Sequence, residues 1–82
     1  MNKQTDDFAL DIEFGKWLGQ IRTAAHLTVR DAAKQTGITE ERLMSLELGY
    51  AERGIRRNEA TSLSKIYNVK LEELLQRALA AE

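Results

Sequence analysis

The chain has 82 residues, of which 43% are hydrophobic and 30% charged, and its net charge at pH 7 is −1. This length is enough for one compact domain and excludes a second folded unit. With no cysteine and one histidine, the chain lacks the ligands for disulfides, iron–sulfur clusters and protein-built zinc sites, so we expect no metal and no cofactor.

The composition favours helix over sheet, because there is no proline, there are only five glycines, and long stretches are rich in Ala, Leu, Glu, Lys and Arg. No apolar run approaches the roughly 18 residues of a membrane span, and no hydrophobic signal region precedes Asp6. We therefore expect an all-α, compact five-helix domain at residues 7–82, after a flexible N-terminus at 1–6, in a cytoplasmic protein without a membrane partner.

A first helix is predicted at about residues 7–25, with Asp6 or Asp7 as its N-cap. Its apolar residues recur with helical spacing at Leu10, Phe14, Trp17, Leu18, Ile21, Ala24 and Ala25. Trp17 falls on the face expected to enter the core. Gly15 and Gly19 lie one turn apart and predict close packing against another helix.

A second, short helix is predicted to begin after Thr28, because Asp31 follows three residues later and approximates a capping box. It should end at Gly37, since glycine tolerates the left-handed conformation that follows a helix. His26, just before this helix, is expected at a helix end, where histidine adopts the same conformation at modest cost.

Thr39 is the predicted N-cap of a third helix at about residues 40–48, which Gly49 should end. The next stretch, 50–57, is predicted to be a loop because it lacks periodicity and contains Gly54. Three arginines gather there: Arg53, Arg56 and Arg57. Asn58 is the predicted N-cap of a fourth helix, and a turn at Asn68 leads to a fifth. The apolar stripe of the fifth helix, from Leu71 to Leu79, extends beyond what the core of five short helices needs, so a dimer contact there is one alternative.

The charges are unevenly distributed, although their sum is close to zero. Two mildly basic stretches, 21–37 and 50–66, flank an acidic one at 38–49. This pattern permits a local basic face without the strongly basic balance of many nucleic-acid-binding domains.

The second and third predicted helices are joined by only a few residues, which is typical of a helix-turn-helix. The sequence also resembles the Xre, or lambda-repressor-like (Cro/CI-type), helix-turn-helix family over about residues 14–76. The resemblance is carried, in the family's order, by Leu18-Gly19, Ile21-Arg22, Leu27-Thr28, Ala33, Gly37-Ile38-Thr39, Leu43, Glu47-x-Gly49, Ile66-x-x-Val69 and Leu74-Leu75.

The resemblance implies a sequence-specific transcriptional regulator that binds double-stranded DNA as a homodimer, with its third helix in the major groove. We expect repression rather than activation. The implied base-contacting residues are Glu40, Glu41, Met44 and Ser45. The implied phosphate contacts are Thr28, Val29, Arg30 and the loop after Gly49, where Arg53, Arg56 and Arg57 lie, and Thr39 and Arg42 complete the predicted DNA-binding set. Arg22 and Glu47 match positions that form a buried ion pair in the family.

Glu40 and Glu41 leave two alternatives open. A carboxylate in the first turn of a helix complements the helix dipole, and it also accepts a hydrogen bond from a cytosine amino group. Two carboxylates near phosphates are otherwise unfavourable. The acidic third helix therefore motivates an alternative function, a protein-interaction module that kept this fold with weak or no DNA binding.

Enzymatic activity is not expected. The sequence offers no nucleophile with a base, no carboxylate pair with a pocket signal and no phosphate-binding loop. Accordingly, no small-molecule substrate is expected either.

Overall fold

Five helices form in the residues that the computed structural model describes, 3–51 and 54–80, and these residues contain no strand. The helices are α1 (Lys3–Ala24), α2 (Val29–Thr36), α3 (Glu40–Leu48), α4 (Arg57–Tyr67) and α5 (Leu71–Ala80). The predicted all-α class is confirmed. None of the helices in these residues is both long enough and apolar enough to cross a membrane.

Helices α2 and α3 have the predicted ends, because local capping sets them. The Thr28 side chain accepts from the Asp31 backbone N–H at 3.0 Å, and the Asp31 carboxylate accepts from the Thr28 N–H at 3.3 Å. The Thr39 side chain caps α3 by accepting from the Arg42 N–H at 3.0 Å. Gly37 and Gly49, with φ of 82° and 85°, terminate the two helices in the left-handed conformation.

The predicted start of α1 was wrong. The helix begins at Lys3, so residues 3–6 belong to it and Asp6 and Asp7 lie inside it instead of capping it. No glycine or proline interrupts the chain before Gly15, so the sequence holds no residue that would keep the helix from extending back to Lys3.

The predicted N-cap of α4 was also wrong. Arg56, not Asn58, occupies the cap position, with extended backbone at φ −88° and ψ 156°, and Asn58 is the second residue of the helix. The cause is Glu59, whose carboxylate accepts from the Arg56 backbone N–H at 2.9 Å.

Among residues 3–51 and 54–80, two that are not glycine adopt the left-handed conformation, and both lie where the sequence indicates a turn. His26 has φ of 61° after α1, and Asn68 has φ of 59° between α4 and α5. Asn and His adopt this conformation more readily than most residues. The two turns reverse the chain so that α2 and α5 fold back on the rest.

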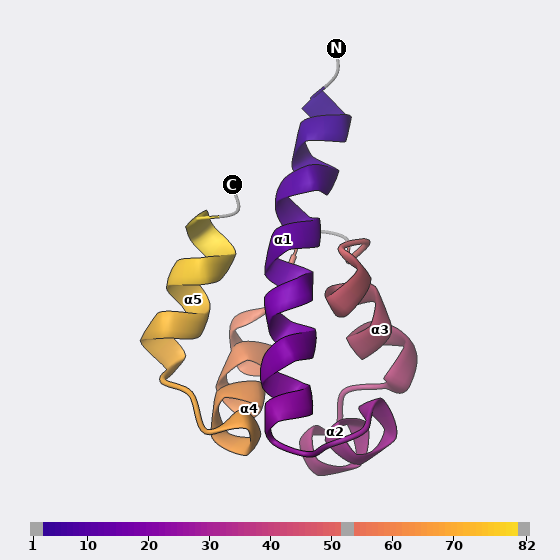
Figure 1. Ribbon diagram of the computed structural model, residues 1–82, viewed down its shortest axis with the longest axis vertical. Coiled ribbons are helices and arrows are strands. Elements are labelled where there is room, and N and C mark those ends of the chain that lie inside the picture. Colours follow the sequence, from indigo (N-terminus) through magenta and orange to yellow (C-terminus); the bar gives the residue numbers. More distant parts are fainter. Residues whose placement is uncertain (1–2, 52–53, 81–82) are drawn as a thin grey trace.

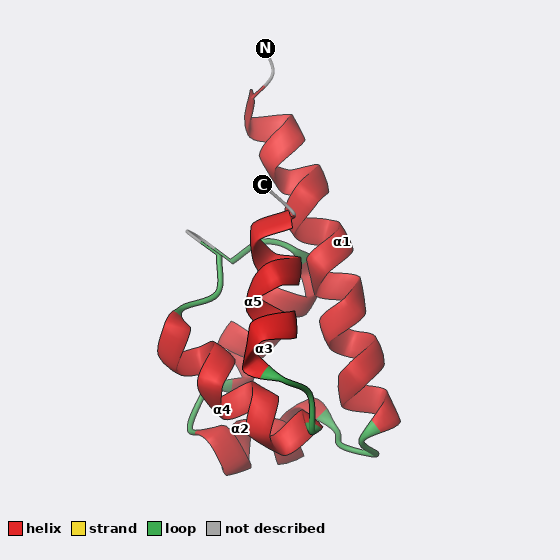
Figure 2. Ribbon diagram, turned by 90° about the vertical axis from the view of Figure 1, so that its left-hand side faces the viewer, coloured by secondary structure: helices red, strands yellow, loops and turns green. Residues whose placement is uncertain are grey.

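Helix α1 is the longest element and runs through the middle of the view in Figure 1, with α3 on one side, α4 and α5 on the other, and α2 at the lower end. The view turned by 90° shows α1 extending beyond the other helices at its start (Figure 2). Side chains from all five helices form one core, in which the fully buried large residues are Leu18, Leu43, Leu63 and Leu74. Trp17 packs against this core, as predicted.

Glycine allows α1 and α3 to approach closely. A Cβ atom at Gly15 would lie 2.6 Å from the Leu46 carbonyl oxygen, and one at Gly19 would lie 3.3 Å from the Glu47 carboxylate. The predicted close packing at these two glycines is confirmed.

The apolar stripe of α5 is used largely within the chain. Leu74 is buried, and Leu71, Leu75 and Ala78 pack against the core. The side chain of Leu79, the last residue of the predicted stripe, lies outside the described residues.

Candidate functional site

A three-residue turn, Gly37-Ile38-Thr39, connects α2 to α3. Its geometry is held by Thr36, whose hydroxyl donates to the Ala32 carbonyl at 2.8 Å and accepts from the Ile38 N–H at 3.1 Å. Ala32 is completely buried, so the helices meet around a small side chain. The turn therefore fixes the direction of α3 relative to α2.

The first turns of α2 and α3 lie next to each other. Arg30 on α2 and Glu40 on α3 form an ion pair, with 3.6 Å between Nε and Oε2, and both side chains are largely exposed. Thr28, at the N-cap of α2, is exposed, whereas Val29 packs against the core. The structure thus brings together the predicted residues at the starts of the two helices.

One face of α3 is open to solvent. Glu40, Glu41 and Met44 are exposed and Ser45 is partly exposed, while Leu43 and Leu46 point into the core. Met44 is 50% exposed, and Leu48, one turn further on, is 54% exposed. These two apolar side chains lie four residues apart, so they fall on the same side of the helix.

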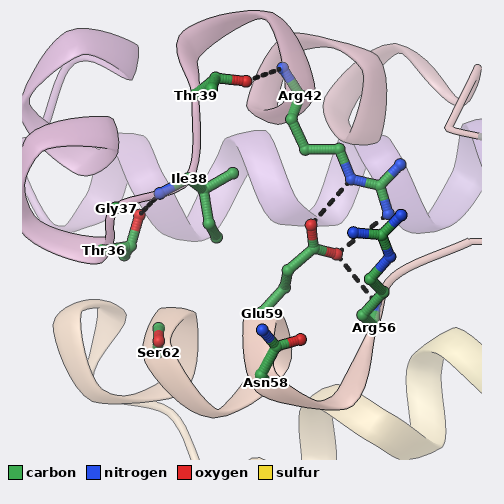
Figure 3. Close-up of a pocket in the computed structure, with 9 residues that line it drawn as sticks. All are labelled: Thr36, Gly37, Ile38, Thr39, Arg42, Arg56, Asn58, Glu59 and Ser62. Carbon is green, nitrogen blue, oxygen red and sulfur yellow. Dashed lines mark hydrogen bonds and ion pairs between the residues drawn. The ribbon is translucent and has the colours of Figure 1, made fainter.

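Arg42 does not join this open face. Its Nε donates to Glu59 Oε2 at 2.8 Å, and its Nη2 donates to Glu59 Oε1 at 3.0 Å (Figure 3). The same Nη2 also donates to the Gly54 carbonyl at 2.8 Å. Only 20% of its side chain is exposed. Among the predicted DNA contacts, Arg42 is therefore a residue whose guanidinium is already engaged within the chain.

Arg42 and Glu59 each favour the charged form of the other. Burial alone would raise the pKa of the Glu59 carboxyl, but the hydrogen bonds from Arg42 and the Arg56 N–H, with the charges of both arginines, lower this pKa from its ordinary value. The hydrogen bonds between Arg42 and Glu59 raise the pKa of Arg42, together with the charge of Glu59, against the opposing effect of desolvation. Both groups are therefore charged at neutral pH.

Two of the three arginines predicted in the α3–α4 connection lie close to Glu59 in sequence, at the start of α4. Arg56 and Arg57 have exposed side chains at the start of α4, whereas Arg53 lies outside the described residues. A groove of about 370 Å³ runs between the α2–α3 turn and the first turns of α4. Its lining residues are Thr36, Gly37, Ile38, Thr39, Arg42, Arg56, Asn58, Glu59 and Ser62 (Figure 3).

The expected ion pair between Arg22 and Glu47 is present. The guanidinium donates to the carboxylate through Nε at 2.6 Å and Nη2 at 3.0 Å, and Nη1 donates to the Leu27 carbonyl at 2.8 Å. The two side chains are 18% and 14% exposed. This pair joins α1 to the end of α3 and lies apart from the open face.

Sequence reasoning missed two features of this region. Glu59 stands three residues after Arg56, the spacing of a capping box, but arginine is not a usual N-cap, whereas Asn58 is of a type that commonly caps helices. Leu48 and Tyr50 are exposed apolar residues. The spacing of Met44 and Leu48, four residues apart, could have revealed an apolar stripe on α3.

Comparisons of the chain with protein-family models, with curated proteins and with solved structures gave no match.

Proposed function

We propose that this protein is a transcriptional regulator of the Xre, or lambda-repressor-like, kind, which binds double-stranded DNA with α3 in the major groove and represses by occupying its site. The observation that supports this most is the arrangement of two capped helices around a three-residue turn. Their exposed first turns meet at the Arg30–Glu40 pair. This is the arrangement that a helix-turn-helix needs in order to reach both phosphates and bases.

Each part of the open surface has a role in this proposal. The first N–H groups of α2 carry the positive end of the helix dipole and suit a phosphate, with Arg30 beside them. Arg56 and Arg57 supply further phosphate contacts from the start of α4. On α3, Glu40 or Glu41 accepts from a cytosine amino group, and Met44 gives apolar contact to a thymine methyl group.

The test is the affinity for duplex DNA as a function of salt concentration, first with mixed sequences and then with sites selected from random duplexes. We expect the affinity to fall as the salt concentration rises, with a slope set by the few phosphates that the protein neutralises, and replacing Arg56 and Arg57 by Ala should flatten the slope by about one unit for each lost phosphate contact. Replacing Lys65, an exposed cation later on α4, by Ala serves as the control and should leave the slope unchanged. No binding at about 50 mM salt would contradict the proposal.

A protein-interaction module is the second candidate function. It is favoured by the exposed Met44, Leu48 and Tyr50, which follow the acidic first turn of α3. Such a surface suits an apolar partner with basic groups at its edge. The same DNA titration separates the two candidates: salt-dependent binding to duplex DNA supports the regulator, and weak or no binding supports the interaction module.

A further inference from the structure

Arg42 and Glu59 connect three parts of the chain. Arg42 lies on α3, Glu59 lies on α4, and their two charge-assisted hydrogen bonds measure 2.8 and 3.0 Å. The same guanidinium holds the Gly54 carbonyl at 2.8 Å, and the same carboxylate holds the Arg56 N–H at 2.9 Å. Figure 3 shows Arg42 reaching down from α3 to Glu59, with Arg56 beside them.

These contacts anchor the part of the α3–α4 connection that carries the cations. Gly54 has a left-handed backbone with φ of 69°, and its N–H donates to the Ala51 carbonyl at 3.2 Å. Gly54 and Arg56 flank Ile55, and each is hydrogen-bonded through its backbone to one member of the Arg42–Glu59 pair. The backbone that places the exposed Arg56 and Arg57 side chains is therefore fixed relative to α3.

The pair itself is poorly placed to contact a partner directly. The Glu59 side chain is only 7% exposed, and its carboxylate is occupied by Arg42 and by the Arg56 backbone. The Arg42 guanidinium directs its Nε and Nη2 donors to groups within the chain, and only 20% of this side chain is exposed. Its effect on binding must act through the position of other groups.

We infer that Arg42 and Glu59 are positioning residues, which hold Arg56 and Arg57 at the distance from α3 where both reach the phosphates, an inference that rests on the proposed DNA binding. Electrostatics alone predicts the opposite sign for Glu59. Removing a negative charge near a polyanion should tighten binding. Removing an anchor of the cations should weaken it.

The experiment measures duplex affinity against salt for Glu59→Gln, Arg42→Lys and the double variant, with circular dichroism showing that each is folded at the assay temperature. We expect each single variant to bind about tenfold more weakly, with a salt slope lower by about one unit or more. Arg42→Lys keeps the charge but loses the fork geometry. The double variant should be no weaker than the singles, because both remove the same anchor.

Glu72→Gln is the charge-matched control, since Glu72 is exposed in the first turn of α5. It should leave the affinity within about twofold of wild type. If Glu59→Gln is not folded, the Arg42→Lys result decides.

Three results would overturn the inference. Unchanged or tighter binding by Glu59→Gln, or unchanged binding by Arg42→Lys, would refute the positioning role alone and leave the proposed function standing. Absence of duplex binding by the wild-type protein would remove the proposed function, and the inference with it.

Discussion

Two largely buried arginine–glutamate pairs connect the helices of this protein through single residues. Arg22–Glu47 ties α1 to α3, and Arg42–Glu59 ties α3 to α4. In each pair the guanidinium donates twice to one carboxylate and once more to a backbone carbonyl. Because the charges are largely removed from water, each pair matters mainly through the cost of leaving one member without the other.

Replacing Glu47 by Ala should lower the free energy of unfolding by about 3 kcal/mol, because it leaves the Arg22 charge in a protected place without its counter-charge. Chemical denaturation followed by circular dichroism measures this change. Glu73→Ala is the control, since it breaks the Glu73–Arg77 pair, whose side chains are about half exposed, and should cost under about 1 kcal/mol. Equal effects of the two substitutions would show that the Arg22–Glu47 pair is not protected.

Tyr67 gives a second prediction, because its hydroxyl is buried and has no hydrogen-bond partner among the described residues. Burial raises the pKa of Tyr67 from 10.0 to about 12, with Glu47 adding to the rise and Arg22 opposing it. The folded state therefore holds this proton more tightly than the unfolded chain. The resulting stability is fully present below pH 10 and is lost as the pH rises to about 12.

Tyr67→Phe removes this titration and the unpartnered hydroxyl together. We expect the variant to be at least as stable as wild type at pH 7, and to lose less stability between pH 10 and 12. Denaturation midpoints across this range give the comparison. Parallel curves for the two proteins would mean that the hydroxyl is hydrated in the folded state.

Side-chain partners that are distant in the sequence mark the limit of what the sequence predicts at this scale. Arg42 follows Thr39 on an amphipathic helix, and nothing nearby indicates that it turns inward. Its partner Glu59 is 17 residues away. The Arg22–Glu47 pair spans 25 residues, and it could be anticipated only through the family resemblance.

At the scale of elements, local capping explains which helix ends were predicted correctly. Thr28, Thr39, Gly37 and Gly49 act through hydrogen bonds or backbone conformations within a few residues. The start of α4 depends instead on Glu59, whose carboxylate accepts both from the Arg56 N–H and from the Arg42 side chain of α3. The predicted caps Asp6 and Asp7 lie inside α1, and the helix begins before the apolar residues on which its prediction rested, so periodicity does not locate its start.

The packing of α1 on α3 gives a prediction at this scale. Gly15→Ala should destabilise the protein by about 2 to 3 kcal/mol, because the new methyl group meets the backbone carbonyls of Leu46 and Glu47, which move only with the whole helix. Gly19→Ala should stay within about 1 kcal/mol of wild type, since the nearest atom belongs to the Glu47 side chain and alanine favours helix. Thermal denaturation of the two variants tests this, and a similar loss in both would contradict the difference in packing.

For the molecule as a whole, local charge matters more than net charge. The sum of −1 gives no general attraction to DNA, so the proposed DNA binding requires a few cations gathered at one place. Arg30 lies at the start of α2, and Arg56 and Arg57 lie at the start of α4. Because few phosphates are neutralised this way, we expect the salt dependence of one copy to be modest compared with that of strongly basic domains.

The size of α3 limits what one copy can recognise. Its nine residues span about 13.5 Å at 1.5 Å per residue, which matches about four base pairs at 3.4 Å each. Four base pairs recur far too often to single out one site among the millions of competing sites in a genome. Two copies on one duplex would double the sequence that is read.

We therefore expect two copies to bind cooperatively to a duplex with two half-sites about one helical turn, roughly 34 Å, apart. Sedimentation of the protein with such a duplex should show two copies of the 9.3 kDa chain for each DNA molecule, with few singly bound complexes. Inserting about five base pairs between the half-sites turns one of them to the opposite side of the duplex, which should abolish the cooperativity while each half-site keeps its own affinity. Cooperativity that survives this insertion would indicate contacts through a flexible connection, and strictly independent binding at both spacings would show that this protein acts as a monomer.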